Sequence, residues 1–254
     1  MHIAIEGIDG VGKTTIARKL AERLDFQFIE KHLHALFDGE RMDRIPNYMR
    51  ITQEINASKD STLRAWFYAL GNLYLRDHYG NADIITDRYF ASNYSWNGNP
   101  ENEFIFNNLI DLLGKPEITF LIYARPEVRE ARLRKRNSND PDLCNATEHF
   151  SDRMYRRLDD FLYRFGFKYH MIDTSDMTAE QTLNRICRIL ALECPECRPH
   201  IFPEKYGLFY SQQAYPTVSL NNSETIPSFC CTVSPDEMQT GIGTLSSFPF
   251  SQIC

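Results

Sequence analysis

Short runs of apolar residues recur along the first three quarters of the chain and predict buried β-strands. These runs cover His2–Glu6, Phe26–Glu30, Asp83–Asp87, Ile118–Tyr123 and Lys168–Ile172. Each run is only five or six residues long. Such segments are typical of strands that lie inside a sheet covered on both faces.

Between these runs, apolar residues return every three or four positions and predict helices. The helical segments are Thr14–Leu24, a pair within Gly39–Tyr79, Glu101–Leu113, Pro126–Arg136, His149–Phe165 and Thr178–Leu192. Pro126 suits a first helical position, and Thr178 with Gln181 predicts a capping box. Alternating strands and helices predict an α/β fold, a five-stranded parallel sheet flanked by helices, in one domain over residues 1–193. Ligands of such sheets bind at the carboxyl ends of the strands.

Residues 194–254 lack this alternation. They hold seven of the 12 prolines and no sustained helical period, so we expect an irregular C-terminal extension. Cys194 and Cys197 are spaced as half of a zinc site, and the adjacent Cys230 and Cys231 make a poor second half. We therefore favour free thiols over a structural zinc site.

Charge and hydropathy limit the kinds of partner. The net charge of −6 argues against a nucleic-acid partner held by a basic face. No apolar run is long enough to span a bilayer, and the first strand begins too early to leave room for a signal peptide. We therefore expect no membrane partner and a cytoplasmic location.

The strongest chemical signal is Gly-Ile-Asp-Gly-Val-Gly-Lys-Thr-Thr at residues 7–15. It matches the G-x-x-x-x-G-K-[ST] loop, which wraps the phosphates of a nucleoside triphosphate. The loop lies between a predicted strand and a predicted helix, where backbone N–H groups and the helix N-terminus face the phosphates. Lys13 adds a full positive charge, and the Thr14 hydroxyl is a ligand for Mg²⁺. The residues expected to hold ATP are Gly7, Asp9, Gly10, Val11, Gly12, Lys13, Thr14 and Thr15.

Asp87-Arg88-Tyr89 forms a second motif at the end of a predicted strand. Asp87 is suited to hold Mg²⁺ through water, and Arg88 to bind a phosphate through two parallel hydrogen bonds. A strand-end ion pair is the structural alternative. The P-loop in the same chain favours the functional interpretation.

These motifs, with Phe67-Tyr68-Ala69 between them and Ser92 after them, resemble the thymidylate kinase family. The similarity continues through Arg125–Arg136, Phe150 to Arg156 and Ile172-Asp173-Thr174, and covers about residues 1–193. The resemblance implies a P-loop kinase that uses ATP and Mg²⁺ to phosphorylate a nucleoside monophosphate. It also implies a homodimer through the helices within residues 39–79.

The resemblance further implies an acceptor pocket. Asp9 would lie beside the acceptor sugar, Arg88 would bind its phosphate, and Asp87 would support the metal. The chain departs from the family in two respects. Gly71 stands where an arginine usually contacts the base, and Ile29-Glu30-Lys31 stands where the family tends to show Arg-Glu-Pro, so that only Glu30 fits. The base would stack on Phe67 and be read by Asn97, and the remaining substrate-binding residues would be Glu30, Tyr68, Ser92 and Trp96. Core packing is the alternative role for the pocket aromatics.

Basic residues after the fourth predicted strand indicate a lid at about residues 136–148. The polar segment Asn137–Thr147 reads as its flap. Arginines that close on a moving phosphoryl group stabilise the charge that spreads over it. Gly10 stands where some relatives carry an arginine, so the missing charge is expected from the lid, above all from Arg136 and Arg153. A solvated basic helix face is the alternative.

The expected reaction is dTMP + ATP to dTDP + ADP, with Lys13, Asp9, Arg88, Arg136 and Arg153 as catalytic residues. Two alternatives stay open. A deoxynucleoside kinase would use Glu30 as the base for a 5′-hydroxyl. A non-catalytic nucleotide-binding module would need no acceptor pocket.

Overall fold

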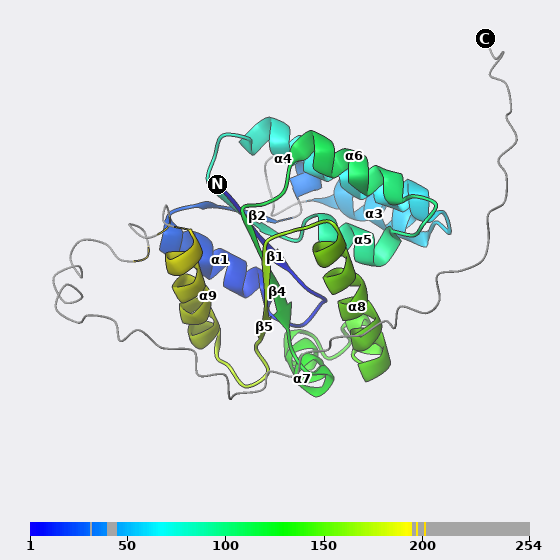
Figure 1. Ribbon diagram of the computed structural model, residues 1–254. Coiled ribbons are helices and arrows are strands. Elements are labelled where there is room, and N and C mark those ends of the chain that lie inside the picture. The colour runs from blue at the N-terminus through cyan, green and yellow to red at the C-terminus, as the bar shows by residue number, and fades with distance from the viewer. Residues whose placement is uncertain (31, 40–44, 195–196, 198–200, 202–254) are drawn as a thin grey trace, which may run out of the picture. The chain divides into compact units, whose positions relative to one another are not determined.

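A five-stranded parallel sheet organises the computed structural model, as the sequence predicts (Figure 1). The structure describes residues 1–30, 32–39, 45–194, 197 and 201. The sheet order is β2-β3-β1-β4-β5, and every neighbouring pair is parallel. The strands are β1 (His2–Glu6), β2 (Gln27–Glu30), β3 (Ile84–Asp87), β4 (Ile118–Tyr123) and β5 (Tyr169–Asp173).

Helices cover both faces of this sheet. Figure 1 shows α1 and α9 on one side and α5 and α8 on the other. The helices are α1 (Lys13–Leu24), α2 (Ala35–Asp38), α3 (Pro46–Ala57), α4 (Ser61–Tyr79), α5 (Phe90–Asn97), α6 (Glu103–Leu113), α7 (Pro126–Arg136), α8 (Glu148–Arg164) and α9 (Ala179–Glu193), with 3₁₀ turns η1 (His32–His34) and η2 (Pro141–Asn145).

Two of the helix starts predicted from the sequence are confirmed. Pro126 begins α7, and Thr178 with Gln181 forms the reciprocal capping box at the start of α9. The pattern did not reveal α5, because seven of its eight residues are buried and it has no polar stripe. The predicted flap contains the short turn η2, whose first residues are capped by Asp140.

Burial on both faces explains the apolar character of the strands. Ile3 and Ile5 of β1 and Phe120 and Ile122 of β4 are completely inaccessible to solvent. They form the centre of one hydrophobic core with the inner faces of the surrounding helices. The core therefore fixes the carboxyl edge of the sheet, where Ile5 and Glu30 both pair in register with Asp87.

The end of α9 leads into the segment predicted to be irregular. Apart from residues 194, 197 and 201, that segment lies outside the described residues, so the domain boundary near 193 stays a prediction. Cys194 and Cys197 are buried, and the Cys197 thiol lies 3.4 Å from the Met1 sulfur. Within the described ranges, no group of three or more His, Cys, Asp or Glu is arranged to hold a metal, and Cys230 and Cys231 lie outside them. None of the helices described is long and apolar enough to cross a membrane.

Candidate active site

The P-loop leaves β1 and opens α1, and glycine permits its path. Gly7 has a φ of +138°, and a Cβ there would lie 2.5 Å from the carbonyl oxygen of Ile122. No larger side chain fits this close approach to β4. The ammonium of Lys13 lies inside the loop and donates to the Ile8 carbonyl at 2.8 Å. Burial, and then the charge of Arg88, lower the pKa of Lys13, so a bound anion would favour its protonated form.

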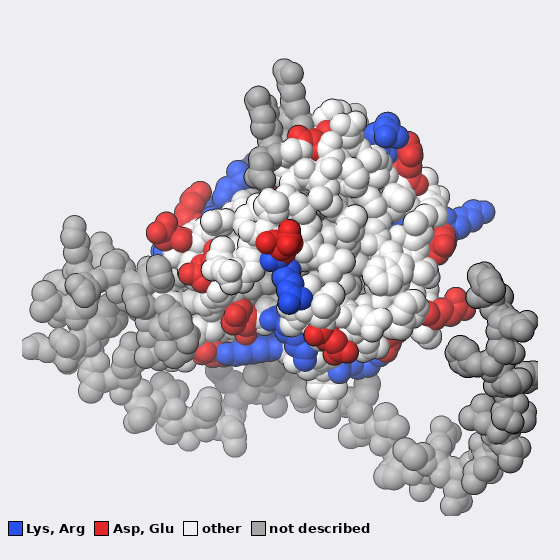
Figure 2. All heavy atoms as spheres, turned by 90° about the horizontal axis from the view of Figure 1, so that it is seen from above, with Lys and Arg blue, Asp and Glu red and all other residues white. Residues whose placement is uncertain are grey.

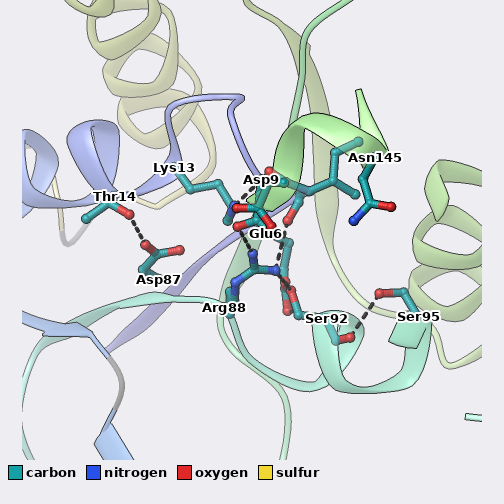
Figure 3. Close-up of polar contacts among 12 residues, drawn as sticks. Glu6, Asp9, Lys13, Thr14, Asp87, Arg88, Ser92, Ser95 and Asn145 are labelled. Atoms are coloured by element: carbon teal, nitrogen blue, oxygen red, sulfur yellow. Dashed lines mark hydrogen bonds and ion pairs between the residues drawn. The ribbon is translucent and has the colours of Figure 1, made fainter. Parts of the chain in front are cut away.

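Thr14 and Asp87 meet across the ends of α1 and β3. The Thr14 hydroxyl donates to Oδ2 of Asp87 (Figure 3). The other carboxylate oxygen, Oδ1, is buried and has no hydrogen-bond partner among the described residues. A hydroxyl and an unsatisfied carboxylate oxygen beside a P-loop are the oxygen ligands that Mg²⁺ prefers. These two residues therefore fit a magnesium ion held directly or through water.

Arg88 is the link between β3 and the P-loop. Its backbone has a φ of +76°, a left-handed conformation that is costly for a non-glycine residue and typical of functional sites. The guanidinium donates to Oδ1 of Asp9 at 2.5 Å and to the Gly7 carbonyl at 3.3 Å (Figure 3). Burial acts to lower the pKa of Arg88, but the charge of Asp9 and the neighbouring carboxylates raises it. Burial likewise acts to raise the pKa of Asp9, and the charges of Arg88 and Lys13 hold it below its ordinary value.

Glu6, at the end of β1, binds the residues that follow Arg88. Its carboxylate accepts from the backbone N–H groups of Tyr89 at 2.9 Å and Ser92 at 3.2 Å, and from the Ser92 hydroxyl. It thereby satisfies orphan N–H groups at the start of α5. Burial raises the pKa of Glu6, and the hydrogen bonds from Ser92 oppose that shift. The helix that follows the Asp-Arg-Tyr motif is thus attached to the end of β1.

Two cavities open beside the P-loop. The larger cavity, of about 810 Å³, lies among β3, α3, α4 and α5, and the P-loop cavity, of about 660 Å³, lies between the loop and α7. Five residues line both cavities: Asp9, Lys13, Thr14, Glu30 and Arg136. Three of these, Asp9, Lys13 and Arg136, belong to the predicted catalytic set. The larger cavity is also lined by four predicted pocket residues, Tyr68, Ser92, Trp96 and Asn97, and by Asp87 and Arg88.

Phe67 does not line the larger cavity, which differs from the sequence prediction. Its ring stacks against Phe37 at 6.2 Å, whereas Tyr68 faces the cavity and donates to Asn56 at 2.8 Å. One residue turns a helix by about 100°, so this single step exchanges the two roles. The residue one turn after Tyr68 is Asn72, not Gly71, and Asn72 lines the cavity.

The predicted base reader Asn97 is already engaged by neighbouring side chains. Its Oδ1 accepts from Nε of Arg64 at 2.9 Å, and its Nδ2 donates to Oδ1 of Asn93 at 3.0 Å. Asn93 in turn donates to the Ala65 carbonyl at 3.0 Å, which ties α5 to α4. The predicted site did not include Arg64, Asn72 or Asn93. Asn93 and Asn97 are four residues apart, but this spacing indicates a shared face only once α5 is known to be a helix.

The predicted lid arginines occupy different places. Arg136 lines both cavities and pairs with Asp140 at 2.6 Å and with Asp142 at 3.0 Å. Arg153 lines neither cavity, because its guanidinium lies over the Phe150 ring at 5.5 Å on the exposed side of α8. The geometry thus brings Arg136, but not Arg153, to the site.

Two further arginines of α7 hold the P-loop itself. Arg129 is completely buried, and its Nε donates to the Asp9 carbonyl at 2.9 Å. Arg132 donates to the Val11 carbonyl at 2.9 Å and to the Thr174 carbonyl at 2.8 Å. These contacts fasten α7 to the loop, so that Arg136 extends from a helix already fixed against it. The spacing of Arg129, Arg132 and Arg136 was the signal for this shared face.

Known proteins are similar to this chain in sequence and in fold. The family model described as "Thymidylate kinase" matches residues 5–186. The chain is 30% identical over 170 residues to a protein of Metallosphaera sedula named "Probable thymidylate kinase", covering 65% of this chain and 81% of that one.

Two solved structures are similar in fold. A deoxyadenosine kinase from M. mycoides, with products dCMP and a flexible dCDP bound, has a TM-score of 0.54 at 15% identity, covering 76% of this chain and 100% of that one. Thymidylate kinase from Candida albicans has a TM-score of 0.53 at 16% identity, covering 75% and 91%. At these identities the structures show the α/β fold alone, whereas the family model covers most of the chain. This chain, with its P-loop and parallel sheet, is a nucleotide kinase that belongs to the thymidylate kinase family.

Proposed function

We propose that the protein transfers the γ-phosphoryl group of ATP to a pyrimidine deoxynucleoside monophosphate such as dTMP. The observation that carries this proposal is the position of Arg88. Its guanidinium lines the larger cavity and touches the P-loop at Gly7 and Asp9. A half-buried arginine that lines the larger cavity and contacts the P-loop suits an acceptor that brings its own phosphate.

The residues of the two cavities have separate roles in binding the two substrates. The P-loop and Lys13 bind the triphosphate from one side, and Arg88 holds the acceptor phosphate on the other. Mg²⁺, when held at Thr14 and Asp87, supplies positive charge to the outer phosphates. An acceptor phosphate is already ionised, so no general base is required, and alignment and charge stabilisation carry the reaction. Asp9 faces the larger cavity, where it is suited to accept from the acceptor sugar.

Arg136 is suited to stabilise the charge of the moving group, because it lines both cavities. Its ion pairs with Asp140 and Asp142 hold the side chain against the start of η2. A phosphoryl group in transit would lie between the same two cavities. A guanidinium at that junction contributes most in the transition state, when charge is spread over the transferred oxygens.

A second candidate is a deoxynucleoside kinase, and the position of Glu30 favours it. Glu30 ends β2, lines both cavities and lies 3.6 Å from Arg18. A carboxylate at this point could accept the proton of a 5′-hydroxyl. The two candidates differ in the acceptor, which is neutral in one case and anionic in the other.

The test is ADP release with Mg²⁺–ATP and a panel of deoxynucleosides and their monophosphates. We expect turnover of monophosphates, a loss of about 1,000-fold in kcat for Lys13→Met, and little change for the exposed control Lys19→Met on the same helix. Turnover of nucleosides alone would favour the second candidate. ATP binding without any turnover would favour a nucleotide-binding module and overturn both.

A further inference from the structure

The larger cavity contains one side-chain amide that the protein itself leaves unsatisfied. Asn72 is 3% exposed, lines this cavity, and its Nδ2 has no hydrogen-bond partner among the described residues. Burying an amide without a partner is costly, so such groups in native proteins are rare and call for an explanation. A ligand in the cavity that offers a hydrogen-bond acceptor to Asn72 supplies one.

The other asparagines of the cavity are already used. Asn56 accepts from Tyr68, and Asn93 and Asn97 bond to each other and to the backbone or Arg64. These bonds fix the orientation of each amide. Among these asparagines, Asn72 is therefore the one whose side-chain nitrogen has no hydrogen-bond partner among the described residues.

The neighbours of Asn72 indicate which part of the ligand it meets. Tyr68 lies one turn earlier on α4, so its ring and the amide share one helix face. Arg88, which is suited to the phosphate, projects from β3 on the P-loop side of the same cavity. A nucleotide whose phosphate lies at Arg88 would direct its base toward Tyr68 and Asn72.

The two guanidinium groups of this cavity already have protein partners. Arg64 donates to Oδ1 of Asn97 and to the Ser58 carbonyl, and Arg88 donates to Asp9. A guanidinium only donates hydrogen bonds, whereas a side-chain amide both donates and accepts. Rotation of the amide by 180° exchanges Oδ1 and Nδ2, so Asn72 can complement either order of donor and acceptor on a base edge.

We propose that Asn72 reads the polar edge of the acceptor base and accepts pyrimidines with either a 4-oxo or a 4-amino group. The 4-oxo edge presents an acceptor beside an N–H donor, and the 4-amino edge presents a donor beside a ring-nitrogen acceptor. Asn72 pairs with both through its two orientations. The enzyme therefore phosphorylates thymine and cytosine deoxynucleotides with comparable efficiency, a conclusion that rests on the proposed monophosphate kinase activity.

The test compares dTMP with 5-methyl-dCMP, which differ only in the 4-substituent and the protonation of the adjacent ring nitrogen. For the wild type we expect kcat/KM values within about tenfold of each other. Asn72→Arg, which only donates, should shift the ratio toward dTMP by about 100-fold. Asn72→Leu, of similar size and without polar atoms, should raise KM for both substrates about equally. Asn184→Arg, at an exposed position of α9, is the matched control and should leave the ratio unchanged.

Two results would overturn the inference: a wild-type preference above about 100-fold for either nucleotide, or unchanged KM values in Asn72→Leu. Thermal unfolding and ATP binding of each variant separate a folding defect from a recognition defect. Failure of the proposed function is distinguishable, because no monophosphate would then be turned over. In that case calorimetric binding of the two nucleotides to wild type and Asn72→Leu decides the role of Asn72 directly: similar affinities that both fall in the variant support it, and unchanged affinities refute it.

Discussion

Nη2 of Arg88 and Oδ1 of Asp9 lie 2.5 Å apart and join the end of β3 to the P-loop. Both side chains line the larger cavity, and Lys13 lies close enough to interact electrostatically with each. The pair therefore connects the loop expected to hold the triphosphate with the cavity expected to hold the acceptor. Its strength should be visible both in stability and in catalysis.

The stability of this pair depends on pH in a defined direction. The pKa of Asp9 is lowered below 3.8 because the charges of Arg88 and Lys13 outweigh the effect of burial. The ionised carboxylate thus stabilises the folded state above that pH, and the contribution is lost as the pH falls toward the lowered value. At pH 7, Asp9→Asn should reduce the free energy of unfolding by about 2 kcal/mol, typical of a hydrogen bond between charged groups.

Urea unfolding at a series of pH values measures this difference. The gap between wild type and Asp9→Asn should be constant from pH 5 to 8 and should shrink below about pH 4. A gap that widens with acidification would contradict the assigned direction. Asp77→Asn, an exposed carboxylate change on α4, is the control and should leave stability nearly unchanged.

Removal of the Arg88 guanidinium should change the kinetic constants for the acceptor more than the KM for ATP. Arg88→Met is expected to lower kcat/KM for the monophosphate by about 100-fold or more, because the charged donor proposed to bind the acceptor phosphate is lost. The KM for ATP should change little. Arg50→Met, in which an exposed arginine paired with Glu54 is removed, serves as the control. An unchanged dependence of rate on acceptor concentration would remove Arg88 from the acceptor site.

The parts of the site that the sequence predicted are those set by local pattern. The P-loop and the Asp87-Arg88-Tyr89 motif depend on residues close in sequence, at the end of a strand whose position is fixed by the sheet. The roles of Phe67 and Tyr68 depend on a one-residue rotation of α4, which is decided by packing against Phe37. No local signal carries that choice, because both neighbours are aromatic and half-buried.

The same limit applied to the lid. Arg136 lines both cavities, whereas Arg153 lies on the exposed side of α8 over the Phe150 ring, and the basic pattern of the sequence does not distinguish these two positions. Arg136→Ala should lower kcat by about 100-fold, since the removed charge lies between both cavities. Arg153→Ala should change kcat by no more than about twofold, as is usual for exposed charges. Single-turnover measurements of the phosphoryl-transfer step compare the two, and equal losses would show that α8 moves toward the site during the reaction.

The homodimer predicted through the helices within residues 39–79 stays a prediction, and the outer face of α4 with its neighbour α6 is a candidate interface for it. Trp66 of α4 is 43% exposed, Phe104 of α6 is 50% exposed, and their rings lie in edge contact at 6.5 Å. Leu63, Leu70 and Leu112 are also exposed large apolar residues of these two helices. On the side of the molecule seen in Figure 2, charged residues lie mainly around the rim and few cross the middle. A face with exposed aromatic residues and few charged ones is typical of an interface between subunits.

Trp66→Glu and Phe104→Glu are each expected to convert a dimer into the 29.6 kDa monomer in sedimentation experiments at micromolar concentration. A buried aromatic anchor contributes about 2 kcal/mol or more to association, and the introduced carboxylate would be buried without a partner. Leu192→Glu makes the same kind of change at a 76% exposed position of α9 and should leave the assembly intact. A wild-type protein that sediments as a monomer, or a Trp66→Glu dimer as stable as wild type, would refute this interface. Because neither residue lines a cavity, kinase activity retained in a monomeric variant would show that each active site is complete within one chain.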